Sequence, residues 1–317
     1  MDKLHNKRVC VTGGAGFIGS HLCQRLLDEG AVVTVVDDFS VGTPANIESI
    51  KDKVTVHRAD IADREAIREI ISGSQIVYHL AALANMRACA DNFDLAFKTN
   101  ITGTYNVLSC CKGVERVIFP SSITTYGFSE RIPINETCET RQNDPYSTSK
   151  VTGEHFVRVF AERLGFTYTI TRKCNSYGPR QTLDYLMPTI IHQGLTRGII
   201  EVWDPRPIRD YIFVSDTVEA LLLMAISDGT RNELVNLGTG TGWSVGDAAQ
   251  QVAELLGVRW RDVNKRQPVA SKLIGDSYKL RSLTGWAPRT SFRDGIIKTI
   301  DYWRSILGRQ SPEATRK

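Results

Sequence analysis

Tyr146 and Lys150 stand four residues apart, and Ser122 precedes them in the chain. This spacing puts the tyrosine and the lysine on one face of a helix. A phenol with its pKa of about 10 is a poor base at neutral pH, but a lysine ammonium beside it favours the phenolate. We therefore expect Lys150 to lower the pKa of Tyr146, so that Tyr146 exchanges a proton with a hydroxyl group held by Ser122.

A glycine-rich segment near the N-terminus, GGAGFIG at residues 13–19, contains a G-x-G-x-x-G pattern. It follows a short apolar run and opens a stretch of helical spacing, as in turns that seat a dinucleotide pyrophosphate at a helix N-terminus. Asp37 ends the next β-branched run and is the natural ligand for the adenosine ribose, with Asp38 as the rival candidate. A carboxylate there repels a 2′-phosphate, which favours NAD over NADP.

Short apolar runs alternate with stretches of helical spacing over the first half of the chain. The expected strands cover residues 31–36, 54–58, 76–80, 117–119 and 168–171, and the expected helices cover 63–71, 95–111 and a segment from about 146. This alternation predicts an α/β fold, a Rossmann-like doubly wound parallel sheet with helices on both faces.

After Asn175 the pattern changes to short elements separated by proline and glycine. We expect these elements to form a smaller C-terminal substrate-binding lobe over the carboxyl ends of the strands. The NAD-binding domain is then residues 1–172 with a later contribution from about 210–236. The substrate-binding lobe takes residues 173–209 and 237–317.

Composition excludes several classes of protein. The formal net charge of +4 is spread without blocks of like charge, so neither nucleic acid nor a membrane surface is an expected partner. The apolar runs are far shorter than the ~20 residues of a membrane span. The seven cysteines show no CxxC or Cys/His ligand spacing, which predicts no metal site and reduced thiols of a cytoplasmic protein.

Taken together, these motifs closely resemble the extended short-chain dehydrogenase/reductase family, specifically its nucleotide-sugar epimerase/dehydratase branch. The resemblance runs in family order through TGGAGFIGSHL, VVDD, ADI, YHLAA, TNITGT, PSSITTYG, DPYSTSK, RKCNSYGPRQ, RDYIFVSD and NLGTG. It implies that Tyr146 is the catalytic base, that Lys150 lowers its pKa, and that Ser122 is the second hydroxyl, assisted by Thr124. The implied NAD-binding residues are Gly13, Gly16, Phe17, Ile18, Gly19, Asp37, Asp38, Asp60, Ile61, Leu80, Ala81, Ala82, Asn100, Tyr146 and Lys150.

The resemblance also implies a nucleotide-sugar substrate. Asn175, Arg209 and Arg266 are expected near its diphosphate, because guanidinium groups suit phosphate oxygens. For Arg209 the alternative is an ion pair with Asp210 or Asp216. Asp60 and Ile61 are expected to contact the adenine of the cofactor, and the alternative for them is a turn that ends a strand. Members of this branch are commonly homodimers built on helices like 95–111 and 146–163.

The segment Ser122-Ile123-Thr124 narrows the expected reaction. The 4,6-dehydratases of this branch follow the active-site hydroxyl with an Asp-Glu pair, and its decarboxylases carry a Glu two positions after that hydroxyl. Neither carboxylate is present here, which favours a 4-epimerase acting on a UDP-hexose-type sugar. The alternatives are a dehydratase, decarboxylase, 3,5-epimerase or ketosugar reductase of the same family, a dehydrogenase of a small alcohol, and a non-catalytic NAD-binding regulator.

One residue departs from the family pattern close to where the nicotinamide is expected. Lys173 stands where the family usually has an aromatic residue. A second cation at this place could alter cofactor electronics, bind a carboxylate, or point to solvent. The sequence leaves these three possibilities open.

Overall fold

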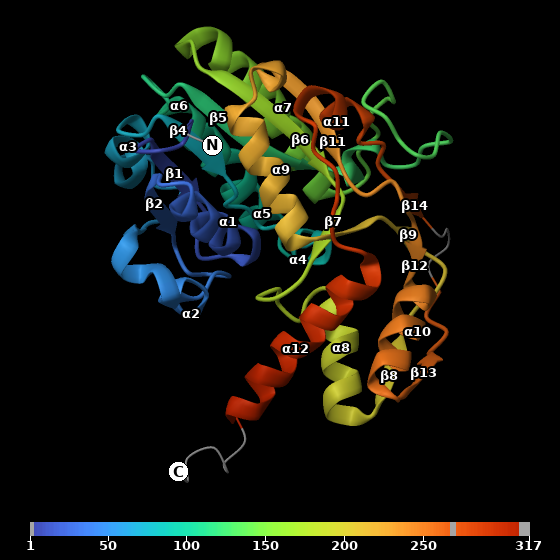
Figure 1. Ribbon diagram of the computed structural model, residues 1–317. Helices are drawn as coiled ribbons and strands as arrows, with labels where there is room; N and C mark the ends of the chain where they lie inside the picture. Colours follow the sequence, from blue (N-terminus) through green and yellow to red (C-terminus); the bar gives the residue numbers. More distant parts are fainter. Residues whose placement is uncertain (1–2, 267–270, 311–317) are drawn as a thin grey trace, which may run out of the picture.

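A seven-stranded parallel sheet forms the centre of the computed structural model, which describes residues 3–266 and 271–310 (Figure 1). The strand order is β11-β6-β5-β4-β1-β2-β3, and every neighbouring pair is parallel. The expected doubly wound α/β fold is confirmed. The strands are β1 (Arg8–Thr12), β2 (Val32–Asp37), β3 (Thr55–Arg58), β4 (Ile76–His79), β5 (Arg116–Ser122), β6 (Thr167–Lys173) and β11 (Glu233–Leu237).

Alternate side chains of the inner strands enter two separate cores, because successive residues of a strand point to opposite faces. On β1, Val9 and Val11 belong to one hydrophobic cluster and Cys10 to the other. Helices α1 (Phe17–Asp28) and α9 (Val214–Ile226) cover the first face. Helices α3 (Arg64–Ser72), α6 (Thr104–Ser109) and α7 (Pro145–Leu164) cover the second.

The helix expected over residues 95–111 is interrupted. It consists of α5 (Phe93–Ala96), a π-helical segment (Phe97–Gly103) and α6, and Cys110 lies at its C-cap. Gly103 packs against Ile61, whose Cδ1 lies 2.5 Å from where a Cβ on Gly103 would stand. Hydrophobic spacing alone does not separate a π turn from an α turn, since both keep an apolar face toward the sheet.

The remaining elements lie mainly in the second half of the chain. Figure 1 shows α8, α10 and α12 grouped at a distance from the central sheet. Three small sheets join β10 to β7, β12 to β9 and β14, and β13 to β8. The helices are α2 (Pro44–Ile47), α4 (Met86–Asp91), α8 (Leu186–Arg197), α10 (Val245–Leu256), α11 (Tyr278–Thr284) and α12 (Phe292–Gln310). The strands are β7 (Asn175–Tyr177), β8 (Ile199–Val202), β9 (Ile208–Arg209), β10 (Tyr211–Phe213), β12 (Trp243–Ser244), β13 (Arg259–Asp262) and β14 (Lys272–Leu273).

The order of the strands reverses between β1 and β4, the two strands from which the sheet grows in opposite directions. In open α/β sheets, ligands bind beside such a switch point, at the carboxyl ends of the strands. Thr12 and His79 end these two strands, so the glycine-rich segment begins at the switch point. Within residues 3–266 and 271–310, no helix has the length and apolar character needed to cross a bilayer.

Candidate active site

The glycine-rich segment forms a tight turn between β1 and α1, as its pattern predicts. Gly13 has a φ of +70°, and a Cβ on it would stand 2.7 Å from the backbone nitrogen of Ala81. A Cβ on Gly19 would collide with the carbonyl oxygen of Gly13. These two glycines are therefore required by the turn and by close packing of helix on strand.

Gly16 is different, because a Cβ there would meet only the Gly13 carbonyl oxygen, at 3.1 Å. This contact requires a small shift, but it is much milder than the contacts that a Cβ would make at Gly13 or Gly19. Gly16 is also the N-cap of α1, which has neither a side-chain cap nor an acidic residue in its first turn. The N–H groups of the first helical turn, which begins at Phe17 and Ile18, thus remain available to an anion.

Asp37 and Asp38 differ sharply in environment at the end of β2. Asp37 is buried, and its two carboxylate oxygens accept hydrogen bonds of 2.9 Å from the backbone nitrogens of Ala15 and Phe39. Burial raises the pKa of Asp37. Each carboxylate oxygen has a further lone pair, so Asp37 keeps the capacity to accept two ribose hydroxyls. Asp38 accepts from the backbone and hydroxyl of Ser40 in an exposed turn.

Asp60 and Ile61 follow β3. Asp60 accepts from the backbone nitrogen of Ala62 and pairs with Lys98 at 2.9 Å, and this pairing contributes to the lowered pKa of Asp60. Ile61 is buried. The turn that was the alternative interpretation is present, and the adenine contact stays a prediction.

The segment after β4, which contains Leu80, Ala81 and Ala82, is held against the glycine turn. The backbone nitrogen of Ala81 donates to the Thr12 hydroxyl. Buried Asn100 makes two hydrogen bonds to the backbone of Leu83, one to its nitrogen at 2.8 Å and one to its oxygen at 3.0 Å. Asn100 thus fixes the segment that follows β4.

Ser122, Thr124, Tyr146 and Lys150 come together at the carboxyl end of β5. Ser122 is the last residue of that strand, and its hydroxyl accepts from Thr124 Oγ1 at 2.8 Å and hydrogen-bonds the Tyr146 side chain. Tyr146 and Lys150 share one face of α7, and Lys150 Nζ lies 5.9 Å from the centroid of the Tyr146 ring. Lys150 Nζ also donates to the Pro120 carbonyl at 3.1 Å. The structure thus assembles the proton-transfer set that the sequence predicts.

The expected lowering of the Tyr146 pKa is not found among the chain's own residues. Burial raises that pKa above its usual value, and the neighbouring Tyr185 adds to the effect. Sequence spacing does not report this desolvation, and the expectation that Lys150 and an oxidised nicotinamide together lower the Tyr146 pKa stays a prediction. Lys150 itself is buried, and its pKa is lowered to about 8 by burial and then by Lys173.

Two residues at the site were missed by sequence reasoning. Tyr185 lies near Tyr146, but it follows 39 positions later and carries no local signal of this proximity. Glu154 is fully buried and binds both Ser121 and Arg172. A signal for Glu154 exists, because it continues the four-residue spacing of Tyr146 and Lys150 along α7.

The three residues expected near a diphosphate have unequal surroundings. Asn175 is exposed on β7. Arg209 donates to the backbone oxygens of Ile208 and Ser271 and to the Ser271 hydroxyl. Arg266 forms ion pairs with Asp262 and, at 3.6 Å, with Asp204.

The alternative interpretation of Arg209 does not hold. Asp210 is fully buried and accepts hydrogen bonds from Thr239 and Gly240, while Asp216 accepts from Thr290. In the described ranges, neither carboxylate forms an ion pair with Arg209. Its guanidinium therefore keeps donors for a further acceptor, since it has five N–H groups.

Comparison with known proteins identifies the family. The model of the NAD dependent epimerase/dehydratase family matches residues 9–238. The chain belongs to this family. A putative UDP-glucose 4-epimerase of Methanocaldococcus jannaschii is 29% identical over 94% of this chain and 98% of its own. A UDP-N-acetyl-alpha-D-glucosaminuronate decarboxylase of Bacillus cytotoxicus is 30% identical over 95% and 98%.

A solved structure of similar fold is the UDP-glucose 4-epimerase of Thermus thermophilus in complex with NAD. It is 30% identical, covers 94% of this chain and 99% of its own, and has a TM-score of 0.86. Family members thus differ in reaction at comparable identity, and the family is what the comparisons share.

NAD is the cofactor of this epimerase/dehydratase family member, and the residues present fit it. Gly16 is packed less tightly than Gly13 or Gly19, and it lies at a helix N-terminus without an acidic side chain. Asp37 offers a negative charge at the end of β2, where the ribose hydroxyls of a dinucleotide bind. These features would hold the pyrophosphate and the adenosine ribose.

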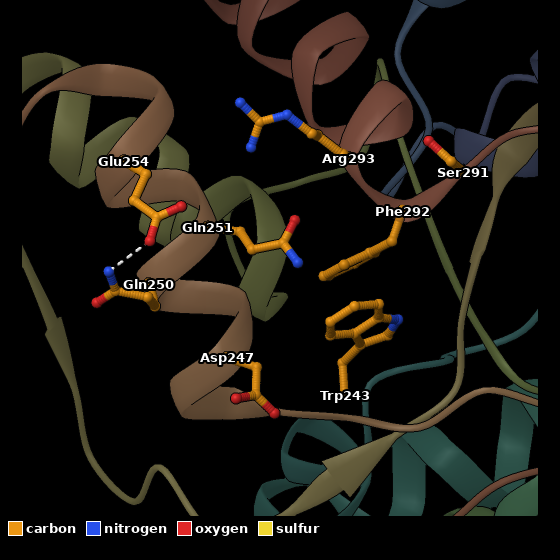
Figure 2. Close-up of a pocket in the computed structure, with 8 residues that line it drawn as sticks. All are labelled: Trp243, Asp247, Gln250, Gln251, Glu254, Ser291, Phe292 and Arg293. Atoms are coloured by element: carbon orange, nitrogen blue, oxygen red, sulfur yellow. Dashed lines mark hydrogen bonds between the residues drawn. The ribbon is translucent and has the colours of Figure 1, made fainter.

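A separate groove of about 520 Å³ lies between α10 and the start of α12 (Figure 2). Trp243 and Phe292 stack in it with their ring centroids 4.9 Å apart. Asp247, Gln250, Gln251, Glu254, Ser291 and Arg293 complete its lining. None of these residues belongs to the predicted site, so the epimerase/dehydratase chemistry is not assigned to this groove.

Proposed function

We propose that this chain is an NAD-dependent nucleotide-sugar 4-epimerase acting on a UDP-hexose-type substrate. One observation carries the proposal. Within the described residues, the Ser122 hydroxyl meets other hydroxyls and a backbone N–H, and no carboxylate hydrogen-bonds to it. Elimination of water requires an acid and a base beside the reacting carbon, whereas oxidation and re-reduction at C4 require one proton acceptor.

Four side chains have distinct roles in the proposed reaction at C4. Ser122 and Thr124 hold the C4 hydroxyl, and Tyr146 takes its proton while the C4 hydrogen leaves with its electron pair. NAD, when bound, supplies the acceptor for that hydrogen and returns it, so it is not consumed. The 4-keto sugar rotates so that the hydrogen returns to the other face of C4, and Tyr146 gives the proton back to the C4 oxygen. Lys150 stabilises the phenolate form of Tyr146 in this exchange.

The substrate side of the proposal uses Asn175, Arg209 and Arg266 for the nucleotide diphosphate. Arg209 supports this role best, because burial lowers the pKa of its guanidinium and no described carboxylate neutralises it. Arg266 must share its charge with two aspartates. We assign residues 1–172 and about 210–236 to NAD binding, and 173–209 and 237–317 to substrate binding; residues 1–2, 267–270 and 311–317 lie outside the described ranges.

We also propose that the enzyme is a homodimer of the cytoplasm. Three large apolar side chains are exposed on the helices expected at the dimer interface: Phe97 by 49%, Tyr105 by 45% and Val159 by 60%. The Tyr105 ring packs edge-on against Phe156 and Phe160, which joins α6 to α7 into one apolar face. All seven cysteines are free thiols, as expected in a reducing compartment.

Mass spectrometry of a nucleotide-sugar panel incubated with the protein in deuterated water tests the reaction. A new chromatographic peak of unchanged mass, without deuterium bound to carbon, is the expected result. Loss of water indicates a dehydratase, loss of carbon dioxide indicates a decarboxylase, and deuterium fixed on carbon indicates a 3,5-epimerase. Any of these three results rejects the proposed 4-epimerase.

A further inference from the structure

Lys173 lies directly beside Ser122. It is the last residue of β6, and the two Cα atoms are register partners in the parallel pair β5–β6. Residues paired in this way project to the same face of a sheet, and their neighbours project to the opposite face. The preceding partners, Ser121 and Arg172, both bind Glu154 on α7. Lys173 therefore points to the same side as the Ser122 hydroxyl.

The ammonium group of Lys173 has no counter-ion within residues 3–266 and 271–310. Its hydrogen bond is to the carbonyl oxygen of Cys174, at 3.2 Å, and the side chain is half-buried. Its charged neighbour is Lys150, whose like charge is unfavourable. Burial lowers the pKa of Lys173 to about 8. Of the three possibilities for this residue, pointing freely into solvent is excluded.

Arg172, the neighbour of Lys173 on β6, is a buried cation that does have a counter-ion. Its guanidinium is matched by both oxygens of Glu154, at 2.7 and 2.9 Å. A buried charge without a partner is costly, and such groups are normally paired. Within the part of the chain that the structure describes, neither Lys173 nor Lys150 forms an ion pair, so an anionic ligand at this site interacts favourably with two ammonium groups.

The position of Lys173 tells which part of a ligand it reaches. Ser122 is the residue assigned to the reacting C4 hydroxyl, whereas the diphosphate is assigned to Arg209. In a hexuronic acid the carboxylate carbon is bonded to C5, the neighbour of C4. A carboxylate at this place therefore lies next to the group that Ser122 holds.

We propose that Lys173 binds the C6 carboxylate of a nucleotide-activated hexuronic acid. This inference rests on the proposed function. Within the hexose-type substrates of that proposal, it selects those whose C6 is a carboxylate. Lys173 acts as a specificity-determining residue, because a neutral hydroxymethyl group leaves its ammonium unmatched.

Calorimetric titration of the Tyr146→Phe protein separates binding from turnover. UDP-glucuronic acid, UDP-galacturonic acid and UDP-glucose are compared with their dTDP counterparts. With the nucleotide that the protein prefers, the nucleotide-linked uronic acids are expected to bind at least about tenfold more tightly than the nucleotide-linked glucose. When Lys173→Met is added to the Tyr146→Phe protein, the affinity for the uronic acids is expected to fall to that for the hexose. The affinity for the hexose is expected to stay within about threefold of its value before the addition. Lys173→Arg is expected to keep the preference for uronic acids, because it keeps the positive charge.

Lys51→Met serves as the matched control, since Lys51 is exposed and pairs with Glu48. It is expected to change neither affinity. NAD content per chain is measured for each variant and is expected to be unchanged. The proposal is overturned if the protein does not prefer uronic acids with either nucleotide. It is also overturned if Lys173→Met lowers the affinity for the hexose as much as that for the uronic acids. Loss of NAD in Lys173→Met overturns it too, because the lysine then serves the cofactor.

The two proposals fail separately. If the parent enzyme eliminates water or carbon dioxide from a uronic acid that Lys173 binds, the 4-epimerase proposal fails and the carboxylate site stands. If it epimerises hexoses and Lys173→Met changes nothing, the carboxylate site fails and the 4-epimerase stands.

Discussion

Glu154 and Arg172 form a bidentate ion pair that ties helix α7 to strand β6 behind the proposed catalytic residues. The Arg172 Nε and Nη2 atoms lie 2.9 and 2.7 Å from the two carboxylate oxygens, and Ser121 donates to the same carboxylate at 2.6 Å. Both charged side chains are buried. Because Tyr146 and Lys150 lie on α7 while Ser122 and Lys173 end β5 and β6, this pair sets the distance between the two halves of the site.

Replacing Glu154 by Ala is expected to lower the free energy of unfolding by about 3–5 kcal/mol, because it leaves the Arg172 guanidinium buried without a counter-charge. The turnover number is expected to fall as well, since α7 loses its tie to β6. Urea titration measures the stability change. Glu162→Ala on the exposed side of the same helix is the control, expected within about 0.5 kcal/mol of the parent. Equal stability of the two variants would contradict this role.

Gly16→Ala separates NAD binding from folding. The added Cβ approaches only the Gly13 carbonyl oxygen, so the fold is expected to survive, whereas a pyrophosphate close to Gly16 is displaced. We expect a melting temperature close to that of the parent and at least about tenfold weaker NAD binding. Gly308→Ala, at a helical position with open space around it, is the control for helix effects. Full NAD occupancy in Gly16→Ala would mean that the pyrophosphate binds elsewhere.

The fold and the convergence of Ser122, Tyr146 and Lys150 could be predicted because both depend on local patterns. Alternating apolar runs predict β1 to β6, and the spacing of Tyr146 and Lys150 predicts a shared helix face. Burial cannot be predicted in the same way. The raised pKa of Tyr146 comes first from burial and then from the charge interaction with Tyr185, which is distant in sequence.

The same distinction explains Lys173. The sequence marks it as a departure from the family, but its direction follows from the β5–β6 register, which pairs residues about fifty positions apart. The pairing of Asp60 with Lys98 and the place of β11 next to β6 are likewise tertiary facts. Motifs predict which residues take part, and long-range packing decides their charge state and orientation.

The lowered pKa of Lys173 is expected to make the free energy of unfolding depend on pH. Its pKa is about 8 in the folded chain and 10.5 for an unperturbed lysine side chain, so between these values the unfolded chain binds more protons. The free energy of unfolding therefore rises with pH over this window. Lys173→Met removes this component and is expected to stabilise the protein at pH 7 by about 1–3 kcal/mol, with the difference vanishing near pH 10.5. Identical pH profiles for variant and parent, measured by urea titration, would contradict an unmatched buried ammonium.

Val159→Lys tests the proposed dimer. Val159 is 60% exposed on α7, and a charge placed there opposes burial of this helix at the proposed dimer interface. Light scattering after size exclusion is expected to give a dimer for the parent and a monomer for the variant. Val32→Lys, at a similarly exposed valine at the start of β2, is the control and should remain dimeric. A monomeric parent, or a variant that still dimerises, would reject this face.

The central claim is oxidation and re-reduction at C4, and a C4-deuterated nucleotide hexose or hexuronic acid tests it most directly. We predict an epimer that carries the deuterium at C4, formed without loss of mass. Tyr146→Phe should form it about 10²–10⁴-fold more slowly, while Tyr278→Phe, at a residue 74% exposed, should match the parent. A product that has lost water or carbon dioxide, or an epimer with solvent hydrogen at C4, would contradict the account.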